Sequence, residues 1–400
     1  MTGPLLHAAR AEALMAAQDL DALVATTYQN VYYASGFWSF TQPLLRTAQV
    51  YAVLPRGAPD RVAVAFPVGE ADMVAECPPH AAQLIPFGVF YVERGDGPLG
   101  GAGDARLLQL GVEAVPEPTA ADALVAALAA AGVTAGRVGI DEIGIAPDVL
   151  ERVRARLDRL TFLPAARTWR AVRAVKTPEE VVRLHRAARI VEGAIDAALQ
   201  AAHAGMTERA MARVFDEAVL AAGAQPLFAV IAFGAHAAYP NARPGDRRLE
   251  AGDLIRFDVG CLFQGYCADI ARTAVFGAPS LRQAAVYRAL LAGLDAALDA
   301  VRPGASAQDV FEAAMAAAQR AGLRHYRRHH VGHGVGLEIY DEPLLGPGQA
   351  IPLEAGMVLE VETPYYELGF GGLQVEETVL VTDGGCRLLT ESDRSLRQVG

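Results

Sequence analysis

The chain has 400 residues, of which 52% are hydrophobic and 20% charged, a composition typical of globular and not of disordered proteins. Its length predicts two or three domains that bury their cores without disulfides or a structural metal. The 35 basic and 46 acidic residues leave a net charge of −11, which argues against a nucleic-acid partner. Charges interrupt every apolar stretch, so we expect no membrane span.

The cysteines and the N-terminus bear on the cellular compartment. The four cysteines form no CxxC pair, which is typical of reduced thiols in the cytoplasm. The N-terminus lacks a basic segment followed by an apolar run, so we expect no signal peptide. The sequence therefore predicts a cytoplasmic location.

The first 165 residues alternate short apolar runs with Ala-rich helical patterns, which predicts an α/β domain. The Gly-rich stretch at 95–104 is predicted to be a loop. Strands are predicted at 20–28, 50–54, 62–66 and 137–141, and a helix at 118–131.

The second half opens with Thr177-Pro178-Glu179-Glu180, a capping box with proline at the first helical position. A long amphipathic helix is predicted from there to about residue 202. Further N-caps are predicted at Thr207, Ser280 and Ser306, before helices at 208–222, 281–301 and 307–321. Strands are predicted at 254–263, 266–276, 357–363 and 373–381. This half is predicted to be α+β with antiparallel strands, and we place the domains at 1–168 and 169–400.

Two aspartates lie on adjacent predicted strands that a two-residue hairpin at 264–265 joins. In that register Asp258 faces Ala271, and Asp269 is its diagonal neighbour on the same face. Two carboxylates on an apolar face repel each other and lose solvation, and a metal ion is the usual compensation. The alternative is a pair of solvated acids on an exposed edge.

Two further signals follow along the chain. The segment HHVGHGVG at 329–336 places three histidines among three glycines, which favours close approach of the backbone to another group over a packed helix. Glu362 and Glu376 are acids inside apolar strands. Periodicity alone does not distinguish them from Glu360 and Glu377.

The ordered set Asp258, Asp269, His333, Glu362 and Glu376 resembles the metal ligands of the pita-bread metallopeptidases. The similar segments are GDLIRFDVGCLFQGYCADIARTAVFG, HHVGHGVGLEIYDEP and EAGMVLEVETPYYELGFGGLQVEETVLVT, within about residue 170 to the end. The segment ALVATTYQNVYYASGF resembles the extra N-terminal domain of the prolidase and aminopeptidase P branch. The resemblance implies a pita-bread catalytic domain after a smaller creatinase-like α/β domain.

The resemblance implies metal-dependent hydrolysis of Xaa-Pro dipeptides, with a water activated by two divalent ions. Four carboxylates and one imidazole suit Mn²⁺ first, with Co²⁺ or Zn²⁺ as alternatives. Asp269 and Glu376 are implied to bridge both ions, Asp258 to bind one, and His333 and Glu362 the other. Glu362 is also implied to be the general base and acid. The alternatives are an aminopeptidase P acting on longer peptides, a hydrolase of small non-peptide amides, and a metal-free binding module.

Three positions depart from the family pattern: Asn241 and Tyr340 stand where the family has His, and Gln374 where prolidases have Arg. We expect Tyr340 to donate a hydrogen bond to the developing oxyanion, and Gln374 to offer the substrate only a neutral hydrogen bond. His329 keeps its family position, which implies a place in the proline pocket. His236 is a candidate for supplying the lost imidazole.

A dipeptidase must bind a free carboxylate next to proline, and an arginine fork suits that group. We favour Arg46, after the loop GFWSFTQPLL, with Arg243 as the second candidate. The nearby aromatic run exceeds what a small domain should expose, which predicts a homodimer, with ordinary core or a lid over its own active site as the alternative. The run is Tyr32, Tyr33, Phe37, Trp38 and Phe40.

Overall fold

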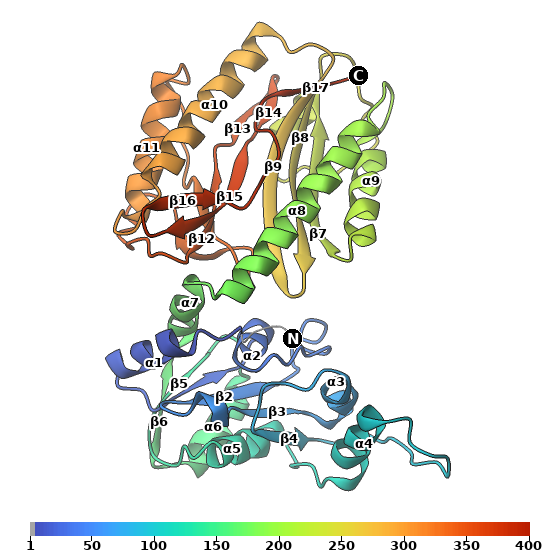
Figure 1. The fold of residues 1–400 in the computed structure, drawn as a ribbon, viewed down its shortest axis with the longest axis vertical. Coiled ribbons are helices and arrows are strands. Elements are labelled where there is room, and N and C mark those ends of the chain that lie inside the picture. The colour runs from blue at the N-terminus through green and yellow to red at the C-terminus, as the bar shows by residue number, and fades with distance from the viewer. Residues whose placement is uncertain (1–4) are drawn as a thin grey trace. The chain divides into compact units, whose positions relative to one another are not determined.

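The computed structural model describes residues 5–400, which divide into two compact units. The first unit runs up to Arg173, and the second is Ala174–Gly400 (Figure 1). The domain limits drawn from the sequence, 1–168 and 169–400, stay a prediction. Within the described residues, no helix combines the length and apolar character needed to cross a membrane.

The first unit is a mixed β-sheet flanked by helices, as expected for an α/β domain. Its helices are α1 (Ala8–Ala17), α2 (Tyr28–Ser35), α3 (Ala71–Glu76), α4 (Ala102–Leu108), α5 (Ala120–Ala130), α6 (Pro147–Arg156) and α7 (Ala166–Ala174). Its strands are β1 (Ala22–Ala25), β2 (Tyr51–Pro55), β3 (Ala63–Pro67), β4 (Gln83–Phe87), β5 (Gly136–Ile140) and β6 (Leu160–Pro164). The sheet order is β4-β3-β2-β1-β5-β6. Helices α5 and α6 pack on one face, and α1 and α2 lie on the other (Figure 1).

Strand β1 is shorter than the strand predicted at 20–28, because the chain enters helix α2 at Tyr28. The carboxylate of buried Asp141 accepts hydrogen bonds from the Thr27 backbone N–H (3.1 Å), the Thr27 hydroxyl (2.7 Å) and the Asn30 amide (2.7 Å). Asp141 follows β5 and is distant in sequence, so a tertiary contact fixes the start of α2. The prediction of a strand through Tyr28 was wrong for this reason.

The aromatic run of the first unit is mostly core. Tyr33 and Phe37 are each 1% exposed, and the Trp38 ring packs edge-on against the Tyr32 ring at 5.0 Å. Of the run, only Phe40 is largely exposed. The expectation of an exposed aromatic surface was therefore wrong, and the homodimer stays a prediction with less support.

The second unit contains two larger sheets, one two-stranded sheet and two pairs of long helices. The helices are α8 (Pro178–Gln200), α9 (Glu208–Ala221), α10 (Leu281–Ala300) and α11 (Ala307–Arg320). The strands are β7 (Gln225–Phe233), β8 (Leu254–Phe263), β9 (Tyr266–Phe276), β10 (Gly332–Gly334), β11 (Asp341–Leu344), β12 (Val358–Glu362), β13 (Tyr365–Glu367), β14 (Gly371–Leu373), β15 (Glu376–Thr382), β16 (Gly385–Leu388) and β17 (Arg397–Val399).

Each helix pair covers one sheet (Figure 1). Helices α8 and α9 pack on the four-stranded sheet β17-β9-β8-β7, and α10 and α11 on the five-stranded sheet β11-β10-β12-β15-β16. Strands β13 and β14 form a separate pair. The predicted capping box of Thr177 and Glu180 is present at the start of α8, and Thr207, Ser280 and Ser306 cap their helices as expected.

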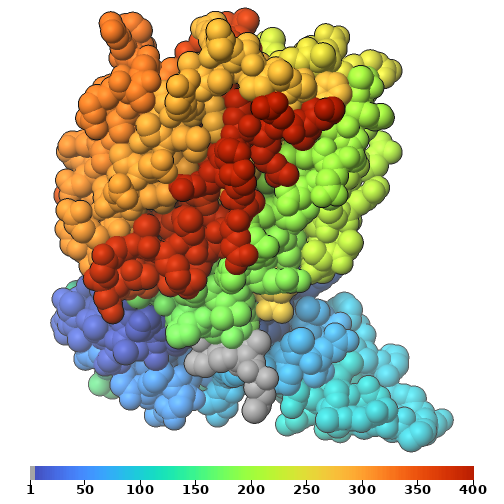
Figure 2. Space-filling model, turned by 45° about the horizontal axis from the view of Figure 1, so that its top comes forward, coloured from blue at the N-terminus to red at the C-terminus, as the bar shows by residue number. Residues whose placement is uncertain are grey.

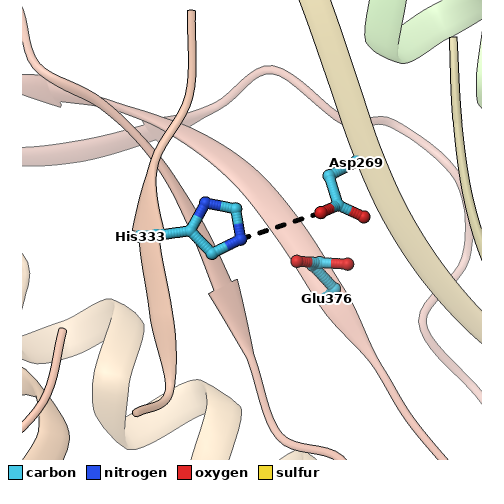
Figure 3. A group of neighbouring side chains, drawn as sticks. All are labelled: Asp269, His333 and Glu376. Carbon is cyan, nitrogen blue, oxygen red and sulfur yellow. Dashed lines mark ion pairs between the residues drawn. The ribbon is translucent and has the colours of Figure 1, made fainter. Parts of the chain in front are cut away.

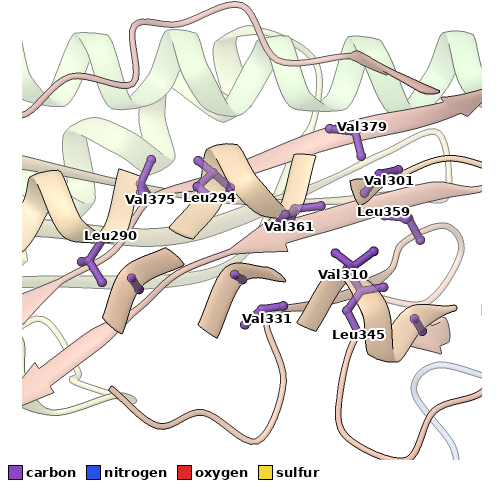
Figure 4. Packing of buried hydrophobic residues seen from close by; sticks show 14 of the residues in the cluster. Leu290, Leu294, Val301, Val310, Val331, Leu345, Leu359, Val361, Val375 and Val379 are labelled. Atoms are coloured by element: carbon purple, nitrogen blue, oxygen red, sulfur yellow. The ribbon is translucent and has the colours of Figure 1, made fainter. Parts of the chain in front are cut away.

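The apolar layer beneath α10 and α11 holds the strands that carry the candidate site. Leu290 and Leu294 of α10 belong to one buried cluster with Val361 of β12 and Val379 of β15 (Figure 4). All four are fully buried. Because each such side chain contributes roughly 1.5–3 kcal/mol, this packing fixes β12 and β15 in place.

Strands β8 and β9 form the predicted hairpin, with Phe263 paired to Tyr266. The turn residues Gln264 and Gly265 both have positive φ, 49° and 85°, as a two-residue turn that follows the twist of the strands requires. At the far edge β17 pairs in parallel with β9. In Figure 2 the C-terminal segment, drawn in red, lies at the surface between α10 and α8.

The strand predicted at 373–381 is interrupted. Strand β14 ends at Leu373 and β15 begins at Glu376. Between them the Thr273 hydroxyl accepts from the Gln374 N–H and donates to the Gln374 carbonyl, each at 2.9 Å. A side chain of β9 thus replaces the ladder partner of Gln374, and the strand is interrupted there.

Candidate metal centre

One cavity of about 330 Å³ in the second unit gathers most of the residues singled out in the sequence. Its volume lies at the small end of the range for ligand sites. The lining residues are Pro240, Asn241, Asp258, Asp269, Arg328, His329, His330, His333, Tyr340, Glu362, Tyr366, Gln374 and Glu376.

The hairpin β8–β9 brings two of the acids to this cavity. Asp258 pairs with Ala271, and Asp269 with Gly260. The aspartates are thus diagonal neighbours on one face, as the turn predicted. A Cβ at Gly260 would lie 2.3 Å from the Ala268 carbonyl oxygen, so only glycine fits opposite Asp269.

The five-stranded sheet supplies the other three candidates. Glu362 of β12 and Glu376 of β15 are directly paired, so their side chains share one face. His333 of β10 points at the same place, with its Nε2 3.7 Å from Asp269 Oδ2 (Figure 3). One ligand atom each from Asp269, His333 and Glu376 lie within 4.8 Å of one another.

The tautomer of His333 follows from its hydrogen bond. Its Nδ1 lies 3.0 Å from the Gly334 carbonyl oxygen. A carbonyl only accepts, so Nδ1 carries the proton and the lone pair of Nε2 faces the carboxylates. Burial lowers the pKa of His333 to about 4, so the ring is neutral at pH 7, the form that binds metals.

The carboxylates form a concentrated negative charge that the protein neutralises only in part. Burial, together with the nearby carboxylates, raises the pKa values of Asp269 and Glu376 well above their ordinary range. Burial raises the pKa of Glu362 to about 7. Among the described residues, Asp269 Oδ1 and Glu376 Oε2 are buried without a hydrogen-bond partner. Carboxylates with orphaned oxygens, grouped around the lone pair of a neutral imidazole, fit a divalent cation.

The structure also separates the acids that periodicity left ambiguous. Glu360 shares the face of Glu362 but lies outside the cavity lining, where its Oε1 accepts from the Thr378 hydroxyl at 3.1 Å. Glu377 points away and pairs with Arg272 at 3.0 Å. Of these four acids, only Glu362 and Glu376 line the cavity.

Sequence reasoning missed Arg256, which stands where the absent arginine was expected to act. Its guanidinium donates to Gln374 Oε1 at 3.1 Å and lies 3.4 Å from Asp258 Oδ2. Gln374 in turn donates to Glu362 Oε2 at 2.9 Å. The positive charge missing from position 374 therefore comes from the neighbouring strand β8. The period-2 pattern of LIRFDVG could have found it, because Arg256 and Asp258 share a strand face.

Sequence reasoning also misses His330 and Arg328, although both adjoin the predicted site residue His329. His330 is buried, with its Nδ1 3.2 Å from Glu362 Oε1. Its Nε2 lies 3.5 Å from the Tyr340 hydroxyl. An imidazole thus reaches Tyr340, the position where the family pattern has a histidine. No local pattern marks His330 over its neighbours.

Two predicted substrate residues of the second unit do not line the cavity. His236 instead pairs with Glu208 at 2.8 Å, which ties the turn after β7 to the start of α9. Arg243 is exposed and outside the lining. Arg46 is exposed in the first unit, and its role stays a prediction. By contrast, His329, Tyr340 and Gln374 all line the cavity.

Comparison with known proteins agrees with this geometry. Residues 182–383 match metallopeptidase family M24, and residues 8–175 match the creatinase/prolidase N-terminal domain. The chain belongs to metallopeptidase family M24. Membership confirms the predicted pita-bread fold with a creatinase-like domain before it, and a metallopeptidase family implies divalent metal ions.

The similar proteins of the M24 family include two curated Xaa-Pro dipeptidases. The one from Pyrococcus furiosus is 35% identical over 227 residues, 56% of this chain and 65% of that one. The chain thus spans just under two thirds of that relative's length. The one from Pyrococcus horikoshii is 31% identical over 264 residues, 64% of this chain and 75% of that one.

Solved structures extend the likeness over both units. The prolidase from Pyrococcus furiosus superposes with a TM-score of 0.73 at 27% identity and covers 96% of this chain and all of that one. The dipeptidase PepE from Mycobacterium ulcerans gives 0.76 at 27% identity, covering 98% and 96%.

Proposed function

We propose that the protein is a metal-dependent Xaa-Pro dipeptidase. The observation that carries this proposal is the convergence of Asp258, Asp269, His333, Glu362 and Glu376 in one small cavity. The curated relatives named Xaa-Pro dipeptidase support the substrate class. A cavity of this size suits a short peptide better than a folded protein.

We propose two divalent ions as cofactors, Mn²⁺ first, with Co²⁺ or Zn²⁺ as alternatives, because the donors are mostly hard carboxylate oxygens. Asp269 and Glu376 are the proposed bridging ligands. Asp258 would complete one site, and His333 with Glu362 the other. When bound, such ions lower the pKa of a coordinated water and polarise the scissile carbonyl.

The remaining chemistry falls to side chains of the cavity. Glu362 is the proposed group that takes a proton from water and returns it to the leaving amine. Gln374 orients Glu362 through its 2.9 Å hydrogen bond. Burial raises the pKa of Tyr340, so its hydroxyl keeps its proton and serves as a donor to the oxygen that gains charge. His329 is the proposed wall of the proline pocket.

The test compares Ala-Pro with Ala-Pro-Ala on protein supplied with Mn²⁺ and again after chelation. We expect the dipeptide to be cleaved faster, activity to disappear with chelator, and added Mn²⁺ to restore it. Preference for the tripeptide would instead support the alternative of an aminopeptidase P. Metal-loaded protein that cleaves neither peptide would contradict both and favour a hydrolase of small amides.

Two further properties belong to this proposal. The four cysteines are free thiols, which supports a cytoplasmic enzyme. The homodimer predicted from the sequence is kept as part of the proposal, and light scattering on the purified protein at micromolar concentration tests it.

A further inference from the structure

The cavity lining includes one arginine whose guanidinium has no hydrogen-bond or ion-pair partner among the described residues. Arg328 is half-buried in the lining and lies over the Tyr366 ring, with its Cζ 5.5 Å from the ring centroid. Its Nε is buried without a hydrogen-bond partner. Within residues 5–400 its guanidinium makes no hydrogen bond and no ion pair of 4.0 Å or less.

The other arginine near the cavity differs in this respect. Arg256 is fully buried and its Nε also lacks a hydrogen-bond partner, but both of its terminal nitrogens are occupied. One contacts Asp258 and Gln374, and the other donates to the carbonyl oxygens of Tyr239 at 2.7 Å and Pro240 at 3.0 Å. Arg256 is therefore part of the scaffold, whereas the N–H groups of Arg328 are free to meet a ligand.

The guanidinium of Arg328 lines the same cavity as the carboxylates of Asp258 and Glu362. Metal ions bound by these acids would neutralise their negative charge. The arginine would then face a site with no anion of its own to pair with, a setting that favours binding an external carboxylate.

We propose that Arg328 binds the free C-terminal carboxylate of the substrate and thereby selects dipeptides; this rests on the proposed dipeptidase function. In an Xaa-Pro dipeptide that carboxylate lies about one residue, roughly 3.8 Å, beyond the scissile bond. An anchor close to the acids meets this requirement, and Arg328 lines the cavity that holds them. A longer peptide presents a neutral amide at this point and forfeits the charge-assisted hydrogen bonds.

The experiment compares Ala-Pro with its C-terminal amide, which has the same scissile bond and no charge. Arg328→Gln removes the guanidinium, and Arg328→Lys keeps a charge without the fork. Arg327→Gln is the matched control, because Arg327 is the exposed neighbour and lies outside the lining. Arg46→Gln is measured in parallel.

We expect Arg328→Gln to raise the KM for Ala-Pro about ten- to hundredfold and to leave the amide within about twofold. Arg328→Lys should recover part of the loss, and Arg327→Gln should change neither substrate. Unaltered hydrolysis of the amide and unaltered metal content show that the variant is folded. Calorimetric titration of the Mn²⁺-loaded proteins with proline and prolinamide supplies a readout without turnover. In this titration Arg328→Gln should weaken the binding of proline and leave the binding of prolinamide unchanged.

Equal effects of Arg328→Gln on Ala-Pro and the amide, or no effect on either, would overturn the assignment. A selective loss with Arg46→Gln alone would move the anchor to the first unit. If the wild type cleaves neither substrate, the dipeptidase proposal fails and the assignment falls with it. That outcome is distinct, because in the other cases the wild type cleaves Ala-Pro.

Discussion

Glu362→Gln is predicted to stabilise the metal-free protein and to destabilise the metal-loaded protein. The side chain is only 8% exposed, and burial raises the pKa of Glu362 from 4.5 to about 7. The folded state therefore holds this proton more tightly than the unfolded state. Its contribution to stability is fully present below pH 4.5 and is lost as the pH rises through about 7.

The magnitude follows from the pKa change. At about 1.4 kcal/mol per pKa unit, the metal-free wild type loses about 3 kcal/mol between pH 4 and pH 8 through this group. Glutamine has no such titration and still accepts the hydrogen bond from Gln374. The metal-free variant should therefore be more stable by about 3 kcal/mol at pH 8 and by less than about 1 kcal/mol at pH 5. For a unit of this size, the former corresponds to roughly 6–12 °C in Tm.

The assay is thermal unfolding of chelator-treated protein between pH 5 and pH 8. Glu217→Gln is the control, since Glu217 is exposed on α9 and its replacement should change little at any pH. With Mn²⁺ added, the sign should reverse, because the variant has lost a ligand. A metal-free Glu362→Gln protein with the wild-type Tm at pH 8, or a difference that persists at pH 5, would refute the reasoning.

Further predictions concern the ligands, the tyrosine, a close contact and the assembly. Asp269→Asn and Glu376→Gln should each abolish activity and metal binding in elemental analysis; normal turnover by a metal-depleted variant would exclude the proposed centre. Tyr340→Phe should slow kcat by roughly 10²–10³ with metal content unchanged, and an unchanged kcat would reduce Tyr340 to a packing residue, stacked 3.7 Å from the His333 ring. Gly372→Ala should destabilise the protein by about 1–3 kcal/mol in denaturant unfolding, since the added Cβ would lie 1.9 Å from the Ala237 carbonyl oxygen. The control is Gly193→Ala, in open space on α8, which should leave stability unchanged or raise it by up to about 1 kcal/mol. Sizing with light scattering should give a dimer, and a monomer would contradict it.

Local sequence patterns were sufficient to predict much of the structure of the second unit. The capping box at Thr177, the hairpin turn at 264–265 and the alternation of β8 and β9 each depend on neighbours in sequence. The hairpin register alone placed Asp258 and Asp269 on one face. Such features are readable because backbone geometry fixes their period and the conformation of the turn.

Identification of the glutamates needed more than periodicity. Glu360 and Glu362 share one strand face, so alternation treats them alike. The family resemblance favoured Glu362 and Glu376, and the structure places these two in the cavity. What separates Glu360 from Glu362 is depth along the strand, which depends on how the two sheets pack.

Only the tertiary structure decided how the departures from the family pattern are accommodated. The guanidinium expected at position 374 comes from Arg256 on β8, and an imidazole reaches Tyr340 from His330. The start of α2 likewise depends on Asp141, more than a hundred residues along the chain from Thr27. Arg256 and Asp141 each lie more than a hundred residues from their partners, whereas His330 lies ten residues from Tyr340 and reaches it through the fold of one short segment. The sequence shows that the residue types a site requires are present, whereas the packing of strands and loops decides which residue of each type lies in the site.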